Sequence, residues 1–83
     1  MGARSRGYTF KDGKLEALHD HIRTAIVTAE TMNHSPRSKT VKLSGLSVST
    51  FYKCWNDPGL FRIEQLYAIY EGLHVPEAER RYV

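Results

Sequence analysis

The chain has 83 residues, a net charge of +3 at pH 7 and 41% hydrophobic residues, which suffices for one small folded domain. No stretch approaches the ~20 apolar residues of a membrane span, and the first residues lack the apolar core of a secretion signal. The single cysteine, Cys54, cannot form an internal disulfide, so a soluble, cytoplasmic protein is expected.

The first twelve residues contain two glycines and two arginines and have no helical period. We predict a flexible basic N-terminal arm over 1–12 and one folded domain over 13–83. A first helix is predicted over 14–32, because apolar residues recur there at spacings of three and four and form one stripe. That stripe consists of Leu15, Leu18, Ile22, Ile26 and Ala29, whereas Asp20, Arg23 and Glu30 fall off it. Asn33 and His34 then break the pattern, and Asn tolerates the left-handed conformation that often ends a helix.

A second and a third helix are predicted around the turn residue Gly45. Ser35 followed by Pro36 is typical of a helix start, so the second helix is expected over 36–44, with its basic residues facing outward. Gly45 can adopt positive φ at the corner, and Ser47 is a second capping residue. The third helix is expected over 48–57, with Phe51 and Trp55 buried one turn apart.

Asp57, Pro58 and Gly59 form a strong stop signal after the third helix. A fourth helix is predicted over 62–72, and Pro76 is expected to open a short last turn over 77–79. No stretch alternates as a strand does, so the sequence predicts an all-α fold of four to five helices. Two sets of residues are expected inside: Ile63, Leu66, Ile69, Tyr70 and Leu73 from the fourth helix, and one contiguous core containing Phe51, Trp55, Leu18, Ile22, Leu66 and Ile69.

The stretch from Pro36 to Trp55 has the plan of a helix-turn-helix, in which two helices cross steeply at a glycine corner. Leu46 is the apolar residue that fills the space between the two helices, and Phe51 anchors the second one. The sequence here resembles the lambda-repressor-like family, which includes the phage repressor and Cro type of helix-turn-helix. The resemblance spans roughly residues 15–79, and two groups of residues carry it: Gly45, Leu46, Ser47, Val48, Ser49, Thr50, Phe51, Tyr52 and Lys53, then Asp57, Pro58, Gly59, Ile63, Glu64, Gln65, Leu66, Ile69, Leu73, His74 and Val75.

The resemblance implies that the third helix enters the major groove of duplex DNA. Side chains on its outer face would read base edges, and residues near the start of the second helix would hold the phosphate backbone. The implied base-reading residues are Val48, Ser49, Tyr52 and Lys53. The implied phosphate contacts are Arg37, Ser38, Lys39, Lys42 and Ser47.

The chain departs from the family pattern mainly in the second helix. Val41 stands where alanine is usual, Thr40 where leucine is usual, and Ser44 where an apolar residue is expected. Arg37 and Ser38 replace the glutamine that braces the phosphate backbone. His74 replaces a glycine after the fourth helix, and we therefore predict that His74 adopts positive φ.

No residues have the spacing of a metal site or a catalytic set. His19 and His21 point to different faces of a helix, and His34 and His74 are isolated, whereas helical metal ligands are three or four residues apart. Cys54 has no neighbouring base to activate it and is expected to be a half-buried packing residue. We therefore expect no enzyme activity, no metal, no cofactor and no small-molecule ligand.

The distribution of charge favours a polyanionic partner. Residues 1–53 carry nine Lys or Arg and four Asp or Glu, whereas 54–83 carry three and five. The leading hypothesis is a bacterial or phage-type transcription regulator that binds duplex DNA sequence-specifically. A homodimer through the C-terminal helices is expected, on a surface containing Tyr70, Leu73, Val75 and Tyr82. The alternative is a protein-interaction module, such as an antirepressor or a phage accessory protein, that has this fold and does not bind DNA.

Overall fold

The computed structural model describes residues 13–82, which form an all-α fold. Four α-helices follow one another in this range: α1 (Gly13–Met32), α2 (Arg37–Ser44), α3 (Val48–Asn56) and α4 (Ile63–Gly72). Two short 3₁₀ turns, η1 (Pro58–Leu60) and η2 (Glu77–Glu79), complete the described elements, and none of the described residues lies in a strand. The all-α prediction and the order of the helices are confirmed. The arm predicted over 1–12 lies outside the described residues.

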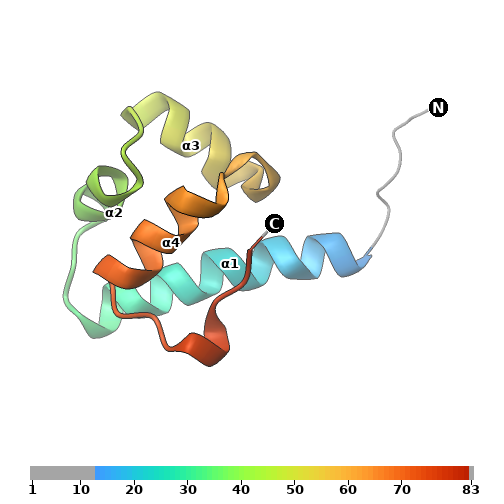
Figure 1. Ribbon diagram of the computed structural model, residues 1–83, viewed down its shortest axis with the longest axis horizontal. Helices are drawn as coiled ribbons and strands as arrows, with labels where there is room; N and C mark the ends of the chain where they lie inside the picture. The colour runs from blue at the N-terminus through green and yellow to red at the C-terminus, as the bar shows by residue number, and fades with distance from the viewer. Residues whose placement is uncertain (1–12, 83) are drawn as a thin grey trace.

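The helix α1 is the longest element and runs along one side of the molecule, with α4 crossing in front of it and α3 on the far side of α4 (Figure 1). α2 packs against both α4 and α3, and η1 contacts α1 and α3. After α4 the chain folds back, and the Tyr70 hydroxyl donates a 2.6 Å hydrogen bond to the Arg81 carbonyl oxygen. The Tyr82 ring packs edge-on against the Tyr70 ring, with the centroids 5.5 Å apart.

One hydrophobic core joins the four helices, as the apolar periodicity predicts. Phe51, Ile22, Leu66 and Ile69 lie within it, and Leu18 and Trp55 are partly buried against it. Leu15 and Ile63 were expected inside and are exposed instead. Ile63 is the first residue of α4 and is 60% exposed, whereas Phe61, two residues earlier, is buried. The buried apolar residues are Ile22, Ala25, Ile26, Ala29, Val41, Phe51, Cys54, Phe61, Leu66, Ile69, Tyr70, Leu73 and Val75.

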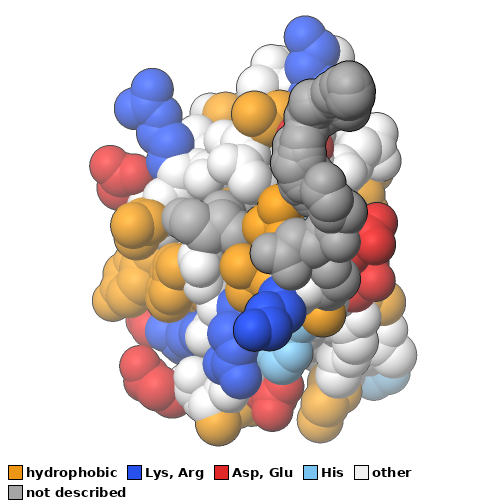
Figure 2. All heavy atoms as spheres, turned by 90° about the vertical axis from the view of Figure 1, so that its right-hand side faces the viewer, with side chains coloured by type: hydrophobic (Ala, Val, Ile, Leu, Met, Phe, Trp, Pro, Cys, Tyr) orange, Lys and Arg blue, Asp and Glu red, His pale blue; other side chains and the backbone are white. Residues whose placement is uncertain are grey.

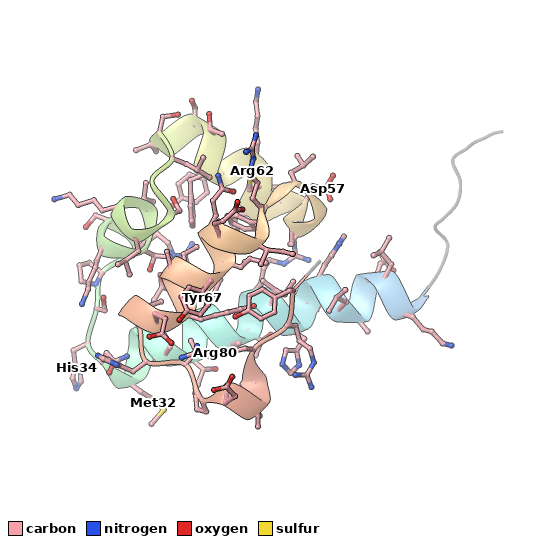
Figure 3. All side chains as sticks on the ribbon, in the orientation of Figure 1. Met32, His34, Asp57, Arg62, Tyr67 and Arg80 are labelled. Carbon is pink, nitrogen blue, oxygen red and sulfur yellow. The ribbon has the colours of Figure 1, made fainter. Side chains whose placement is uncertain are left out.

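The connection from α1 to α2 differs from the sequence prediction. Pro36 is the residue preceding α2, not its first helical residue, and Ser35 makes no capping hydrogen bond, since its buried hydroxyl has no partner in the structure. The left-handed residue after α1 is His34, with φ of 51°, in place of Asn33. Asn33 instead uses its side-chain amide to join two helix ends, donating to the carbonyl oxygens of Ala29 at 2.8 Å and Leu73 at 2.6 Å. His34 lies at the corner that follows α1 (Figure 3).

Two backbone predictions at turns are confirmed. Gly45 has φ of 76° at the end of α2, where its amide donates to the Lys42 carbonyl oxygen. His74 has φ of 57° after α4, in the region that histidine enters more readily than most residues other than glycine. Both residues reverse the chain directly after a helix, which is why each needs the left-handed conformation.

Candidate nucleic-acid interface

The start of α3 is fixed by Ser47, as the sequence predicts. Its hydroxyl accepts a hydrogen bond from the Thr50 amide at 3.3 Å and donates one to the Thr50 hydroxyl at 3.0 Å. Its carbonyl oxygen accepts the Phe51 amide at 2.8 Å. The side chain of Ser47 is therefore occupied in capping the helix, although the residue itself is exposed.

Phe51 determines which face of α3 points into the protein. Its side chain is 0% exposed and lies among three other aromatic rings. The rings of Trp55 and Phe61 have their centroids 5.9 Å from the Phe51 ring, and that of Tyr52 has its centroid at 5.2 Å. Phe51 and Cys54 are both buried and lie one turn apart, so they define the inner face of α3, and Ser49 and Lys53 lie on its opposite side.

The outer face of α3 carries all four residues for which base reading is predicted. Val48 is 62% exposed, Tyr52 is 40% exposed, and Ser49 and Lys53 are also exposed. Positions 48, 49, 52 and 53 share one side of a helix because they are one turn apart. Val48 and Tyr52 also line a groove between α3 and α2, whose opposite wall contains Ser38 and Lys42.

Four of the five residues predicted to contact phosphate lie on α2, and they fall into two groups. Ser38, Lys39 and Lys42 are exposed on α2, next to the outer face of α3. Arg37, predicted to face outward, is half-buried instead and is held by Glu30. Its Nε lies 2.7 Å from Glu30 Oε2 and its Nη2 lies 3.0 Å from Oε1, which is a bidentate ion pair.

The charge of the α2–α3 segment is positive throughout. Residues 37–56 contain one arginine, three lysines and no acidic residue. Since Glu30 neutralises Arg37, the three lysines supply the positive field around the outer face of α3. By contrast, basic and acidic side chains are intermingled on the face at the N-terminal end of α1 (Figure 2).

Sequence reasoning missed a buried polar cluster beneath α2. Glu30 falls off the apolar stripe of α1, yet it is only 8% exposed. Thr40, which stands where the family has leucine, is fully buried and donates a 2.5 Å hydrogen bond to Glu30 Oε2. The signal in the sequence was a threonine at a core position of the second helix, ten residues after an acid on the first.

Ser44 is the other polar residue at an expected apolar position, and its hydroxyl is also satisfied. It donates to the Val41 carbonyl oxygen at 2.6 Å and accepts the Leu46 amide at 3.2 Å. Ser44 thereby tightens the last turn of α2 and the corner that leads to α3. The departures from the family pattern are thus accommodated without an unsatisfied hydroxyl at positions 40 or 44.

A second contact that the sequence did not reveal holds the C-terminal end of α3. The Arg23 guanidinium donates to the carbonyl oxygens of Trp55 at 2.9 Å and Asn56 at 3.4 Å. Asp20 orients the same guanidinium through a 2.7 Å ion pair. A cation at this end of a helix satisfies carbonyl groups that lack helical partners and interacts favourably with the helix dipole. Ser47 and Arg23 therefore fix the two ends of α3.

The remaining chemically active side chains are dispersed. Among residues 13–82, no three His, Cys, Asp or Glu side chains gather into a group that could hold a metal ion. His21 contacts Glu79, with Nε2 3.0 Å from its carbonyl oxygen, whereas His19 lies near Gly59. Cys54 was expected to be half-buried and is fully buried, and burial raises the pKa of its thiol.

The C-terminal surface differs from the one expected for a dimer. Tyr70, Leu73 and Val75 belong to the core, because they are at most 2% exposed. Of that group only Tyr82 reaches the surface. On α4 the exposed large apolar side chains are Ile63 and Tyr67, the latter on the outer side of the helix (Figure 3).

Comparisons with protein-family models, curated proteins and solved structures found no match to this chain. Within 13–82, no helix combines the length and the apolar character needed to cross a membrane.

Proposed function

We propose that this chain is a small sequence-specific duplex-DNA-binding protein, a transcription regulator of bacterial or phage type with a lambda-repressor-like helix-turn-helix. One observation carries the proposal. The outer face of α3 presents short polar side chains and a lysine, beside two exposed lysines of α2, in a segment without acidic residues. A helix of this kind fits the major groove, where polar side chains read base edges and cations meet phosphate.

Each exposed residue of α3 has a role suited to its chemistry. Ser49 donates to or accepts from a base edge, Lys53 reaches guanine or a phosphate, and Val48 meets a thymine methyl group. Tyr52 hydrogen-bonds to a phosphate or lies along a base edge. Ser38, Lys39 and Lys42 of α2 hold the backbone beside the groove, and Ser38 and Lys39 lie at the N-terminus of α2, which favours anions.

The mechanism we propose is steric, and it needs no catalysis, cofactor or metal. The protein occupies its operator and thereby excludes or positions the polymerase. A homodimer would place two copies of α3 in half-sites separated by one helical repeat of DNA. A salt dependence of binding is expected, because each lysine that neutralises a phosphate releases counterions.

Replacing Lys53 with alanine tests the proposal directly. The change should weaken binding to a selected duplex by about 1–3 kcal/mol if the lysine reads a base. The free energy of unfolding should change by less than about 0.5 kcal/mol, because the lysine is exposed. Lys14→Ala, which removes an exposed lysine at the start of α1, is the matched control and should affect duplex binding less.

The double variant Ser49→Ala/Lys53→Ala separates this proposal from the alternative. If duplex binding survived both changes, α3 would not be the reading helix. If the unaltered chain showed no salt-dependent binding to duplex DNA, the protein-interaction module would become the better reading. An electrophoretic or anisotropy titration at two salt concentrations measures both outcomes.

A further inference from the structure

The buried carboxylate of Glu30 connects three helices. It lies on α1 and accepts two hydrogen bonds from Arg37, at the first position of α2, and one from Thr40, a turn later. The guanidinium carbon of Arg37 in turn lies 4.1 Å from the centroid of the Trp55 ring on α3. Glu30, Arg37 and Trp55 therefore form a clamp, referred to below as the Glu30 clamp.

The geometry of Arg37 is unsuited to a phosphate contact. Its fork of N–H donors is aimed at Glu30, and one face of the guanidinium is covered by the indole ring. The hydrogen bonds that Arg37 donates to the Glu30 carboxylate are the largest influence on the pKa of Arg37, and they raise it. An arginine that turned to DNA would leave the Glu30 carboxylate buried without its charge partner, which is costly.

The Glu30 clamp lies on the inner side of α3, opposite the outer face for which base reading is proposed. Trp55 follows Phe51 by four residues, so the two stacked rings share the inner side of the helix whose outer face carries Ser49 and Lys53. Arg23 holds the carbonyl oxygen of the same Trp55 from α1. The orientation of α3 relative to α2 thus depends on contacts made by α1 on the inner side of both helices.

We propose that Arg37 is a positioning residue, and that the Glu30 clamp sets the angle at which α3 meets DNA without touching the DNA itself. This inference rests on the proposed function and deepens it. The position of Arg37 at the start of α2 favoured a phosphate contact, and in this proposal the exposed Lys39 and Lys42 take that role instead. Affinity for duplex DNA then depends on a buried acid of α1 that lies beneath the basic α2–α3 segment.

If the Glu30 clamp positions α3, replacing Glu30 should change DNA affinity in the opposite direction from the one that electrostatic attraction alone predicts. Glu30→Gln removes a negative charge close to the basic α2–α3 surface, and simple attraction to phosphate predicts tighter binding. A positioning role predicts weaker binding, because glutamine cannot form the bidentate ion pair that holds Arg37 on Trp55. Glu64→Gln removes an exposed acid from α4 and is the charge-matched control.

A second readout distinguishes positioning from phosphate contact. Removing a phosphate ligand lowers the slope of log K against log salt concentration by about 0.9. Lys42→Ala should show that decrease. Arg37→Met should weaken binding while leaving the slope at the wild-type value, because no counterion-releasing contact is lost.

The probe is a fluorescein-labelled duplex that the wild-type chain has enriched from a random-sequence library, and binding is followed by anisotropy at several salt concentrations. Glu30→Gln and Arg37→Met should each bind about tenfold more weakly, and the double variant should be no weaker than the weaker single variant. Trp55 is the only tryptophan, so its emission spectrum reports the clamp in each variant. Both single variants should shift that spectrum, whereas Glu64→Gln should not.

Far-UV circular dichroism establishes a temperature at which every variant is folded, and Arg37→Lys replaces Arg37→Met if the latter unfolds. Arg37→Lys keeps the charge without the planar fork, so it should also bind more weakly at an unchanged slope. Glu30→Gln binding as tightly as the wild type or tighter, or a slope lowered by about one in Arg37→Met, would overturn the clamp while leaving DNA binding intact. Absence of salt-dependent binding by the wild-type chain would overturn the proposed function and this inference with it.

Discussion

Replacement of Phe51 with alanine should test the central packing of this protein. The side chain is fully buried and joins Trp55 and Phe61 in an aromatic cluster between α3 and the start of α4. Truncation of a buried phenylalanine costs about 3–5 kcal/mol, because apolar transfer energy is lost and a cavity remains. A domain of this length has a total stability of about 4–12 kcal/mol, so the loss is a large fraction of it.

Urea unfolding at 25 °C followed by far-UV circular dichroism measures the change. Circular dichroism is preferable to fluorescence here, because Trp55 stacks on Phe51 and its emission would change even without unfolding. The midpoint should fall steeply at an unchanged denaturant slope, unless the variant is already partly unfolded in water.

Tyr67→Ala is the matched control, since it removes an aromatic ring from the exposed side of α4. It should cost less than about 1 kcal/mol, because little buried apolar area is lost. A loss below about 1 kcal/mol for Phe51→Ala would refute the reasoning, because it would mean that α3 is not anchored through this ring.

Three further predictions concern stability and are each measured by thermal or urea unfolding. Gly72→Ala should lower the free energy of unfolding by about 1–2 kcal/mol, because the new methyl group would overlap the Leu43 side chain where α4 meets α2. In a Leu43→Ala background the same change should raise the free energy of unfolding, since alanine favours the helix. His74→Gly should add about 0.5–1 kcal/mol by relieving positive φ, and a loss of stability would show that the imidazole contributes more than its backbone costs. Burial raises the pKa of the Cys54 thiol and that of the Tyr70 hydroxyl above their ordinary values, so the folded state holds these protons more tightly than the unfolded state does. Stability should therefore be complete below pH 9 and decline above it, and Cys54→Ala should flatten the first part of that decline.

The sequence by itself determined the helices and most of the core. Apolar residues at spacings of three and four located α1 and α4, and Gly45 and Ser47 located the corner between α2 and α3. These signals are local, because helical periodicity, capping and positive φ depend on residues a few positions apart. The predicted burial of Phe51 therefore identified the outer face of α3 correctly, and Val48, Ser49, Tyr52 and Lys53 are exposed on it.

Contacts between helices were decided only by the tertiary structure. In the sequence, Glu30 resembles a surface acid and Thr40 a polar residue at a core position. In the structure α1 and α2 bring them together in the interior, where the Thr40 hydroxyl donates a hydrogen bond to the Glu30 carboxylate. Arg37 looks like a surface cation at the start of a helix for the same reason, although an acid seven residues earlier removes it from the surface charge. A buried ion pair stabilises the fold only when both of its partners are buried together. Whether they are depends on which faces of two helices are in contact, and the periodicity of a single helix does not specify those contacts.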